Sequence, residues 1–428
     1  MKVLVVGGGG REHALVWKIS QSPMVDRIFC APGNAGIAQM AECVDIKPEE
    51  IHKLADFAEQ MQIDLTVVGP EAPLTMGIAD EFDKRGLKIF GPNKLAAEIE
   101  GSKIFAKSLM KKYNIPTAEY ETFTDLNEAL SFLEKITPPV VVKADGLAAG
   151  KGVIVAVDKQ TAVDGVKKIM GEKVFGKAGD RIVIEEYLEG REVSILAFTD
   201  GKTVLPMVSA QDHKRVFDND KGPNTGGMGA FSPSPIYSEE LASIVEKEIL
   251  HKAVEAMGRE GRAYKGVLYA GLMITSQGPK VLEFNCRFGD PETQVVLPRM
   301  ENDLVEVMLA VSENRLNEIK LSWSDKKAVC VIMASGGYPG KYEKGKVING
   351  LSDAETIDDV IVFHAGSRKE DGQVLTNGGR VLGVTGLGKT LEEAADKAYE
   401  GVNKIKFDNV HYRKDIGRNL SPRPSIRL

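Results

Sequence analysis

The chain has 428 residues, 43% of them hydrophobic and 27% charged, which is typical of a soluble globular protein with several structural units. Its 55 Lys and Arg residues stand against 61 Asp and Glu residues. The resulting net charge of −6 excludes an overall basic field that would attract nucleic acid or an anionic membrane. No apolar run approaches the roughly 20 residues that cross a bilayer, so we expect no membrane partner.

The cysteines and the N-terminal residues bear on the cellular compartment in which the protein is expected. Cys30, Cys43, Cys286 and Cys330 show no C-x-x-C spacing, which predicts reduced, mostly buried thiols. The chain enters an apolar strand directly at its N-terminus, without the pattern of a signal peptide. We therefore expect a cytoplasmic protein that acts on small molecules, as a monomer.

Residues 1–102 alternate short apolar strands with helical stretches, which predicts a parallel α/β domain. The expected strands at 3–6, 28–31, 65–68 and 88–90 each end in a loop rich in Gly or Pro, and a helix is expected over 12–20. Open α/β sheets bind ligands at this end of their strands, so we expect a substrate site there. Glu71 lies in one such loop, where a carboxylate suits a ribose diol or remains a solvated turn residue.

The glycine-rich turn at 7–10 does not fit a dinucleotide fingerprint. The third glycine of G-x-G-x-x-G would fall on Glu12 or His13, depending on the starting residue. What remains is a glycine-rich turn before a helix, which favours either a generic phosphate cradle assisted by Arg11 or a purely structural tight turn.

A helix is expected from 103 to 113, followed by a small α/β unit with a glycine-rich hairpin. Strands at 140–143 and 153–157 flank a loop whose Gly146 and Gly150 enclose three residues, and Gly152 occupies the Ser/Thr position of a P-loop. The loop therefore does not match the Walker pattern. It instead predicts a flap over ATP phosphates, with Lys143 at its base. A loop with solvent-facing lysines is the alternative.

Two further segments suggest nucleotide contacts. After an apolar strand beginning at Ile182, the backbone of 185–188 is suited to an adenine edge, and Glu192 to the ribose. The basic run 211–215 precedes the glycine-rich loop 222–230, which predicts a second anion site. His213 alone is more typical of a structural histidine than of a catalyst. A long helix at 238–259 then leads to strands at 266–274 and 280–285.

The stretch 281–294 carries the strongest chemical pattern. Glu283 and Asn285 are two residues apart on an expected strand, so both side chains point to one face. A carboxylate and an amide oxygen suit magnesium that carries nucleotide phosphates, and Arg287 follows on the same face. Asp290 and Glu292 flank Pro291 in a turn that leads to a helix. The alternative is a solvated surface turn. The preceding strand, 269–273, offers no acid for a second metal ion.

From about residue 325 the pattern changes to short β segments at 328–334, 360–365 and 381–386, followed by a helix at 390–405. We therefore predict a multidomain protein of α/β and α+β class. The expected division is an α/β substrate-binding domain (1–102), a linker helix (103–120), a lid (121–190), a central domain (191–325) and a small α+β C-terminal domain (326–428).

Seven motifs in order carry a family resemblance: G-G-G-G-R-E-H-A, P-G-N-A-G, G-P-E-A-P-L, K-A-D-G-L-A-A-G-K-G, Q-D-H-K-R, N-T-G-G-M-G-A and N-C-R-F-G-D-P-E-T-Q. They cover nearly the whole chain, which resembles the ATP-grasp ligases and, among them, the glycinamide ribonucleotide synthetase family. The resemblance implies that ATP, glycine and 5-phosphoribosylamine give glycinamide ribonucleotide, ADP and phosphate through a glycyl phosphate in de novo purine biosynthesis. It also implies Mg²⁺ or Mn²⁺.

The resemblance further implies roles for individual residues. The residues implied for ATP are Lys103, Lys143, Gly146, Gly150, Lys151, Gly152, Glu185, Glu186, Tyr187, Leu188 and Glu192. Glu283 and Asn285 are implied as metal ligands. Arg287 and Lys214 are implied to stabilise the transferring phosphoryl group, with Asp212 and His213 as further candidates in catalysis. The residues implied for the other substrates are Gly9, Arg11, Gly33, Asn34, Glu71, Asp290 and Glu292.

Three other functions remain open. A related purine ligase or carboxylase that activates bicarbonate or formate would share Glu283, Asn285 and Lys143, without needing the Q-D-H-K-R and R-F-G-D-P-E motifs together. A non-catalytic nucleotide sensor on the same fold would be expected to lack the metal pair or the phosphate lysines. A dehydrogenase conflicts with the broken dinucleotide fingerprint.

Overall fold

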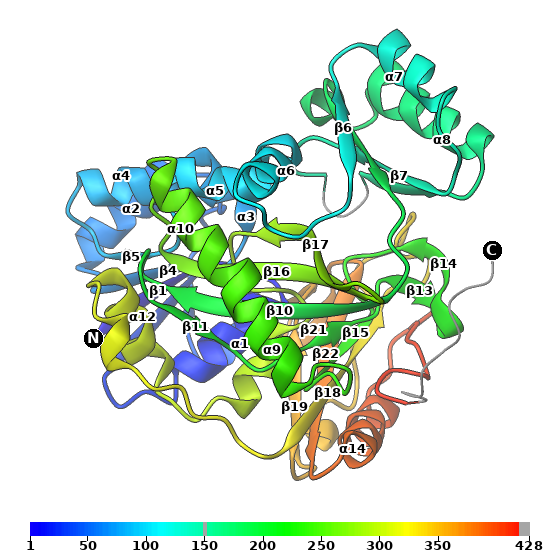
Figure 1. Ribbon diagram of the computed structural model, residues 1–428. Helices are drawn as coiled ribbons and strands as arrows, with labels where there is room; N and C mark the ends of the chain where they lie inside the picture. The colour runs from blue at the N-terminus through cyan, green and yellow to red at the C-terminus, as the bar shows by residue number, and fades with distance from the viewer. Residues whose placement is uncertain (149–151, 419–428) are drawn as a thin grey trace.

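Four main β-sheets organise the computed structural model, which describes residues 1–148 and 152–418. Three of them lie together in the body of the molecule, whereas the fourth projects from one side with helices α7 and α8 (Figure 1). This arrangement confirms the predicted multidomain α/β and α+β class. No helix in the described ranges combines the length and the apolar character that a bilayer crossing requires.

The N-terminal sheet is entirely parallel and has the strand order β3-β2-β1-β4-β5. Its strands are β1 (Lys2–Gly7), β2 (Arg27–Pro32), β3 (Glu42–Cys43), β4 (Leu65–Val68) and β5 (Ile89–Phe90). The connecting helices are α1 (Gly10–Ile19), α2 (Ile51–Met61), α3 (Glu71–Met76), α4 (Ile78–Lys84) and α5 (Lys94–Gly101). The continuous run Val3–Val6 is fully buried, as expected for a strand with helices on both faces.

Helix α1 begins at Gly10, two residues earlier than predicted. The carboxylate of Glu12 accepts the backbone N–H of Gly9 at 2.6 Å and so caps the start of the helix from the N3 position. Gly10 lies close to Gln294, since a Cβ there would stand 2.6 Å from Nε2 of that side chain. The glycine-rich turn therefore brings the helix terminus close to the distant segment 290–294.

The projecting sheet has the order β6-β9-β7-β8 and is antiparallel. It consists of β6 (Tyr120–Phe123), β7 (Val140–Ala144), β8 (Val153–Ala156) and β9 (Ile182–Glu186), with α7 (Leu126–Leu133) and α8 (Lys159–Val166). Strands β7 and β8 form the predicted hairpin. This unit has a hydrophobic core of its own, and helix α6 (Lys103–Lys112) connects it to the N-terminal sheet.

The central sheet is antiparallel and has the order β11-β10-β16-β17. Its strands are β10 (Arg191–Thr199), β11 (Val204–Pro206), β16 (Gly266–Thr275) and β17 (Gly278–Asn285), and the adjoining helices are α9 (Glu239–Val245), α10 (Lys252–Arg259), α11 (Thr293–Val296) and α12 (Leu304–Ser312). The long helix predicted at 238–259 is present, but a π-helical segment at Glu246–His251 interrupts it between α9 and α10.

The C-terminal sheet has the order β12-β15-β18-β22-β19 and takes two strands from the middle of the chain. Strands β12 (Gln211–Asp212) and β15 (Gly229–Ser232) extend the sheet formed by β18 (Lys327–Ala334), β19 (Val360–His364) and β22 (Arg380–Gly388). Helices α13 (Leu351–Glu355) and α14 (Leu391–Lys404) belong to this unit. Two hairpins complete the β structure: β13 (Arg215–Phe217) with β14 (Lys221–Asn224), and β20 (Ser367–Glu370) with β21 (Gln373–Thr376).

The remaining helical turns are short. They comprise 3₁₀ turns at Ile37–Gln39, Gly176–Gly179, Asp218–Asp220, Leu297–Arg299 and Leu316–Glu318, and a π segment at Lys167–Gly171.

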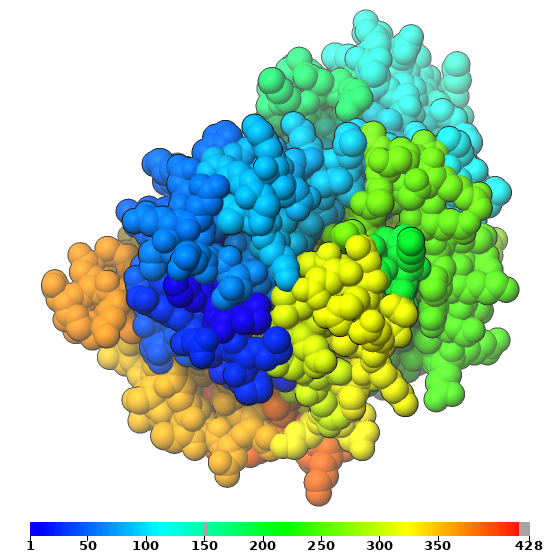
Figure 2. Space-filling model, turned by 90° about the vertical axis from the view of Figure 1, so that its left-hand side faces the viewer, coloured from blue at the N-terminus to red at the C-terminus, as the bar shows by residue number. Residues whose placement is uncertain are grey.

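The N-terminal sheet and the central sheet share continuous hydrophobic cores. One such cluster joins Leu4 and Phe29 to Leu268 and Phe284, so the two sheets pack as one body. Figure 2 shows the N-terminal residues (blue) against the segment near residue 300 (yellow). Polar contacts reinforce this interface: Nζ of Lys18 donates to the Met300 carbonyl at 2.5 Å. All four cysteines are free thiols, and only Cys43 is exposed.

Candidate functional site

Strand β17 places Glu283 and Asn285 on one face, as predicted. In the antiparallel pair with β16, Glu283 lies opposite Gly271 and Asn285 opposite Tyr269. Gly271 lies against the glutamate, since a Cβ there would be in van der Waals contact with Cγ of Glu283 at 3.4 Å. Nη2 of Arg287 donates to Oδ1 of Asn285 at 3.3 Å, so the three side chains occupy one site.

Four cations from four different segments converge on Glu283. Burial acts to raise the pKa of this carboxyl, but the charges of Lys214, Lys143, Lys103 and Arg287 outweigh it and lower the pKa. Lys103 begins α6, Lys143 lies in β7, and Lys214 follows β12. Residues that are up to 184 positions apart in the sequence thus surround one carboxylate. Such a cluster is suited to an anion with several negative charges.

Lys103 and Lys143 each contact oxygen atoms of neighbouring segments. Nζ of Lys103 donates to the Gly146 carbonyl at 3.0 Å, and burial lowers the pKa of Lys103. Nζ of Lys143 lies 3.0 Å from Oε2 of Glu185 and donates to the Leu282 carbonyl at 3.1 Å. The hairpin β7–β8 and strand β17 therefore meet at Lys143.

The residues predicted for the adenine and for the flap lie around the same lysine. Glu185 is buried in β9, and Glu186 accepts from Lys280 at 3.0 Å. Tyr187 is half-buried and Leu188 is buried. Gly146 adopts a φ of +142°, which favours glycine, and Gly152 closes the hairpin by accepting the Ala144 N–H at 2.8 Å. Gly150 and Lys151 lie outside the described residues.

Lys214 and Asp212 form the opposite wall of the site. Nζ of Lys214 lies 2.7 Å from Oε2 of Glu192, and the charges of Glu192, Asp212 and Glu283 overcome burial and raise the pKa of Lys214. Burial raises the pKa of Asp212, and Glu292, Glu192 and Glu283 add to the increase, although Lys214 opposes it.

His213 stands beside this pair but points to other groups. Its Nδ1 lies 3.7 Å from Oδ1 of Asp220, and its ring packs near Phe231 at a centroid distance of 5.8 Å. Nε2 is buried and has no hydrogen-bond partner among the described residues. The backbone of His213 and Lys214 bonds to Met228 and Thr225, so the basic run and the glycine-rich loop lie side by side, as predicted.

Arg287 is the centre of a second ion-pair network. Its guanidinium contacts Glu71 at 3.1 Å through Nε and Glu100 at 3.0 Å through Nη2. Burial acts to raise the pKa of Glu71, but Arg287 and Arg11 outweigh it and lower the pKa to about 2. Burial raises the pKa of Glu100, which also accepts the Cys286 N–H at 2.7 Å. Arg287 thereby joins helices α3 and α5 of the N-terminal unit to the end of strand β17.

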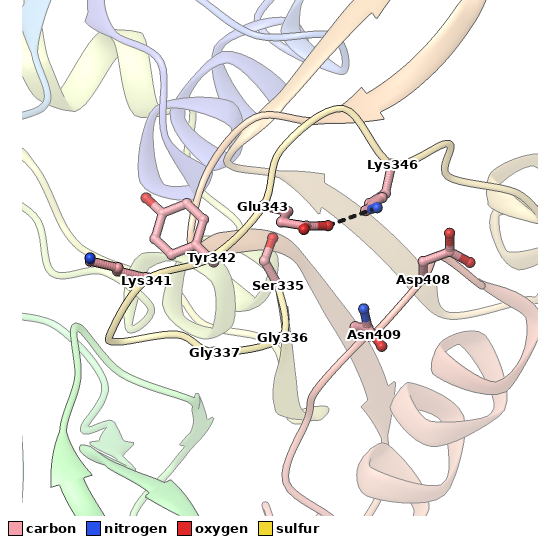
Figure 3. A pocket seen from close by; sticks show the side chains of 9 residues that line it. All are labelled: Ser335, Gly336, Gly337, Lys341, Tyr342, Glu343, Lys346, Asp408 and Asn409. Atoms are coloured by element: carbon pink, nitrogen blue, oxygen red, sulfur yellow. Dashed lines mark ion pairs between the residues drawn. The ribbon is translucent and has the colours of Figure 1, made fainter.

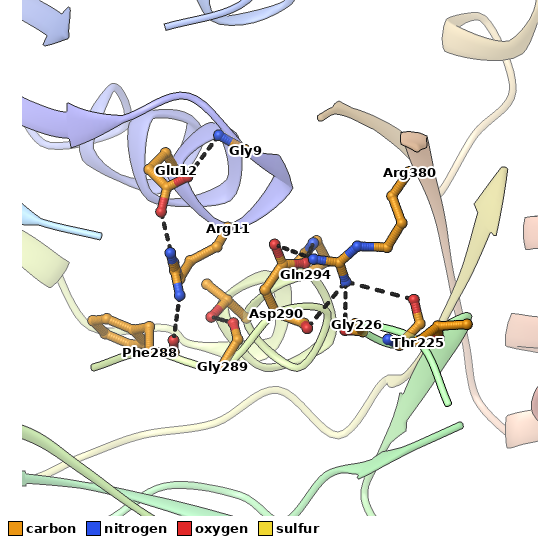
Figure 4. Close-up of polar contacts among 12 residues, drawn as sticks. Gly9, Arg11, Glu12, Thr225, Gly226, Phe288, Gly289, Asp290, Gln294 and Arg380 are labelled. Carbon is orange, nitrogen blue, oxygen red and sulfur yellow. Dashed lines mark hydrogen bonds and ion pairs between the residues drawn. The ribbon is translucent and has the colours of Figure 1, made fainter. Parts of the chain in front are cut away.

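The glycine-rich turn, Arg11 and Asn34 form a tightly bonded corner. Nε of Arg11 lies 2.6 Å from Oε1 of Glu12, and Nη1 donates to the Phe288 carbonyl at 3.2 Å (Figure 4). The Asn34 amide donates to the Gly8 and His364 carbonyls and accepts from Gly36 and Ile37. Gly33 adopts a φ of +75°, and a Cβ on Gly8 would meet its carbonyl at 2.5 Å.

Asp290 and Glu292 make internal contacts on two sides of the turn. Nη2 of Arg380 lies 2.9 Å from Oδ2 of Asp290, and Nε2 of Gln294 donates to Oδ1 at 2.8 Å (Figure 4). Burial acts to raise the pKa of Asp290, but Arg380 and Arg11 lower it. Glu292 is 3% exposed and accepts from Tyr269 at 2.6 Å.

Three residues of this region were not predicted: Glu100, Lys107 and Arg380. Glu100 and Lys107 have the sequence context of ordinary helix charges, and Arg380 follows two glycines far from the other motifs. Lys107 lies one helical turn after Lys103, and this i, i+4 spacing is the one signal that could have revealed it. The other two depend on contacts between distant segments.

A cavity of about 550 Å³ lies elsewhere, in the C-terminal unit (Figure 3). Its lining within the described chain runs from Ser335 to Asn409 and includes none of the predicted site residues. Two lysines and two acids line it, and Lys346 pairs with Glu343 at 2.8 Å. Its charges are balanced, so it lacks the cation excess found around Glu283.

Family models match three consecutive parts of the chain. They are described as phosphoribosylglycinamide synthetase N domain (residues 1–100), ATP-grasp (A) domain (101–293) and C domain (328–419). A curated protein from Caldanaerobacter subterraneus subspecies tengcongensis, named phosphoribosylamine–glycine ligase, is 55% identical over 97% of this chain and 99% of its own length. A protein of the same name from Escherichia coli O6:H1 is 53% identical over 97% of this chain and 98% of its own length.

Solved structures agree with these matches. The crystal structure of a phosphoribosylamine–glycine ligase from Thermotoga maritima has a TM-score of 0.84 at 36% identity, covering 97% of this chain and all of that one. A biotin carboxylase from Campylobacter jejuni has a TM-score of 0.76 at 14% identity, covering 97% and 94%, and shares the fold alone. With matches to all three domain models and more than half of its residues identical to a full-length relative, the chain belongs to the phosphoribosylglycinamide synthetase family.

Proposed function

We propose that this protein is an ATP-dependent ligase that joins glycine to 5-phosphoribosylamine and releases glycinamide ribonucleotide, ADP and phosphate. The observation that carries this proposal is the convergence of Lys103, Lys143, Lys214 and Arg287 on Glu283. Phosphoryl transfer depends mainly on positioned positive charge around the phosphates, and this cluster supplies it. The names of the relatives at 53–55% identity support the choice of substrates.

ATP would bind between the flap and the central sheet. Lys103 and Lys143 would hold the phosphates, with Gly146, Gly150, Lys151 and Gly152 in the flap above them. The backbone of Glu185, Glu186, Tyr187 and Leu188 would contact the adenine, and Glu192 the ribose. Glu192 and Lys214 lie 2.7 Å apart, so the acid proposed for the ribose and a cation proposed for the transferring phosphoryl group line the same site.

Glu283 and Asn285 would hold Mg²⁺ or Mn²⁺. No group of three or more His, Cys, Asp or Glu side chains in residues 1–148 and 152–418 is arranged to hold a metal ion by itself. A carboxylate with one amide oxygen fits a hard cation whose remaining ligands are nucleotide phosphates and water. When bound, the ion neutralises phosphate charge.

Phosphoribosylamine would bind where the N-terminal sheet meets the turn 288–294. The backbone of Gly9 and Gly33, with Arg11 and Asn34, borders this site, and Glu71 is the acid suited to the ribose hydroxyls. Asp290 and Glu292 would shape its floor, since both are held by internal contacts.

The reaction would proceed in two steps. A carboxylate oxygen of glycine attacks the γ-phosphorus and the bond to the β-phosphate oxygen breaks, giving glycyl phosphate and ADP. The amine nitrogen of phosphoribosylamine then attacks the glycyl carbonyl carbon, the bond to the phosphate oxygen breaks, and the nitrogen loses a proton. Arg287 and Lys214 would stabilise the charge that develops on the transferring group. Asp212, whose pKa is raised, is the candidate to receive the proton, with His213 beside it.

We extend the proposal to organisation and location. Segments 1–102, 103–120, 121–190, 191–325 and 326–428 would act as substrate domain, linker helix, lid, central domain and C-terminal domain. The protein would work as a cytoplasmic monomer, and its free thiols are consistent with a reducing compartment.

The deciding experiment measures ADP formation with ATP and magnesium, adding glycine and freshly made phosphoribosylamine singly and together. Turnover only when both are present is the expected result. Turnover with bicarbonate or formate in place of glycine would replace the proposed substrate while keeping the ATP site. ADP formation that needs neither would contradict the ligase reaction.

A further inference from the structure

Two buried lysines share one carboxylate where the flap meets the body of the protein. Nζ of Lys107 and Nζ of Lys143 each lie 3.0 Å from the same oxygen, Oε2 of Glu185. The three residues are between 2% and 5% exposed. One carboxylate oxygen of Glu185 serves two cations, so Glu185 cannot neutralise both lysines, and the carboxylates of Glu186 and Glu283 act on one lysine each. Buried charge without a counter-ion is unfavourable, so the cluster is suited to receive an anion.

The two lysines differ in what else they contact. Lys143 donates to the carbonyl of Leu282, the residue before Glu283, and so belongs to the ring of cations around that carboxylate. Lys107 donates instead to Oγ1 of Thr117 at 2.7 Å, and this hydroxyl donates to the Val281 carbonyl at 2.7 Å. Lys107 is therefore anchored through Thr117 to the linker that joins lid and body.

We propose that Lys107 is a positioning residue for ATP: it holds Glu185 so that this carboxylate cannot fully neutralise Lys143, whose charge stays available to the nucleotide phosphates. Without Lys107, Glu185 and Lys143 form a one-to-one ion pair, and a phosphate has to compete with that pair. With Lys107, the carboxylate keeps a second cation when Lys143 contacts phosphate. This inference rests on the proposed use of ATP.

The electrostatic surroundings provide a second readout. The charged and titratable groups that face Lys107 are Glu185 and Glu186 on β9, Lys143 on β7, Tyr120 on β6 and Lys111 on α6. Burial lowers the pKa of Lys107 to about 8, although Glu185 opposes the change. The positive charge of Lys107 is therefore present at pH 7 and lost well above pH 8. Nucleotide affinity should fall over the same range.

The test compares Lys107→Met, Lys107→Arg and the matched control Lys111→Met. Lys111 lies one turn later in α6, is exposed, and has its Nζ 5.6 Å from the Tyr120 ring, close to the 5.7 Å of Lys107. Calorimetry gives the Kd for ADP at pH 7 and pH 9.5, and steady-state assays give KM for ATP and kcat. We expect Lys107→Met to raise both Kd and KM about tenfold, the effect of one charge-assisted contact, with kcat within about twofold of wild type.

The variants separate positioning from simple loss of packing. Lys107→Arg should bind ADP at pH 7 like wild type and keep that affinity at pH 9.5, since arginine does not titrate there. The inference is overturned if Lys107→Met binds ADP as tightly as Lys111→Met, or if it lowers kcat and leaves KM unchanged. Should Lys107→Met fail to fold, Lys107→Arg decides: the same weakening at pH 9.5 as in wild type would overturn the inference. Wild-type ADP binding without ligase turnover would contradict the proposed function alone.

Discussion

Arg287→Lys tests how far the planar guanidinium, as opposed to its charge, organises the site. Arg287 makes four contacts: to Glu71 at 3.1 Å, to Glu100 at 3.0 Å, to Asn285 at 3.3 Å and to the Phe288 carbonyl at 3.3 Å. These partners lie in different directions around the fork. A lysine ammonium is a single point and cannot reach all of them.

The expected magnitude follows from these contacts. Lysine retains the pairing with one carboxylate and loses at least one charge-assisted contact, each of which contributes about 1.5–3 kcal/mol. If Arg287 also stabilises the transferring phosphoryl group, the combined loss should be about 3–4 kcal/mol, or roughly 10²–10³-fold in kcat. The bulk of the effect should therefore appear in kcat.

The assay follows ADP release with saturating glycine and phosphoribosylamine. Arg315→Lys is the matched control, because Arg315 also pairs with two carboxylates, those of Glu313 and Glu318, but lies 45% exposed at the surface. That variant should retain wild-type kcat, as expected for exposed ion pairs. A kcat for Arg287→Lys within threefold of wild type would refute the assigned role and leave Arg287 as a structural link between domains.

Three further outcomes are expected. Glu283→Ala should lower turnover at least 10²-fold with an unchanged circular dichroism spectrum, and near-normal turnover would remove Glu283 from the metal site. The pKa of Glu71 is depressed from 4.5 to about 2, so its ionised form stabilises the folded state above about pH 4.5 and this stability is lost as the pH falls toward 2. Urea unfolding should show the advantage of wild type over Glu71→Gln shrinking by about 1.4 kcal/mol between pH 6 and pH 3.5; a constant difference would contradict the pairing with Arg287. Arg413 is fully buried and pairs with Asp415 and Asp220 at 2.8 Å, so Arg413→Met should lower the free energy of unfolding by about 3–5 kcal/mol. Arg418 is exposed, so Arg418→Met should lower it by about 1 kcal/mol or less. Equal losses in the two variants would contradict this difference.

The sequence predicted those parts of the fold whose signals are local. Long apolar strands such as β1, β7 and β17 and the helix α14 were located within a few residues, because their periodicity and flanking residues are written in adjacent positions. The strands β12 to β15 were not predicted, since runs of two to four residues carry no clear apolar pattern. Strands β12 and β15 are stabilised by partners far along the chain, whereas β13 and β14 pair with each other. The π segment at 246–251 has no sequence signal that we could identify.

The site residues show the same difference between local sequence signals and contacts that form only on folding. Glu283, Asn285 and Arg287 were grouped correctly because they lie within five residues on one strand and its continuation. Glu100, Lys107 and Arg380 could not be grouped with them, because only folding brings a helix end, a linker helix and a C-terminal strand to the same place.

The participation of β12 and β15 in the C-terminal sheet has a consequence for biosynthesis of the protein. Asp212 belongs to β12, which pairs with β15, and β15 pairs with β18, which in turn needs β22. The residue that completes β22 is Gly388, so about nine-tenths of the chain has to leave the ribosome before this sheet can be complete. A fragment that stops near residue 325 keeps β12 paired with β15 and leaves the other edge of β15 without β18. Synthesis of the chain therefore exposes an unpaired edge of β15 until the C-terminal unit has been made.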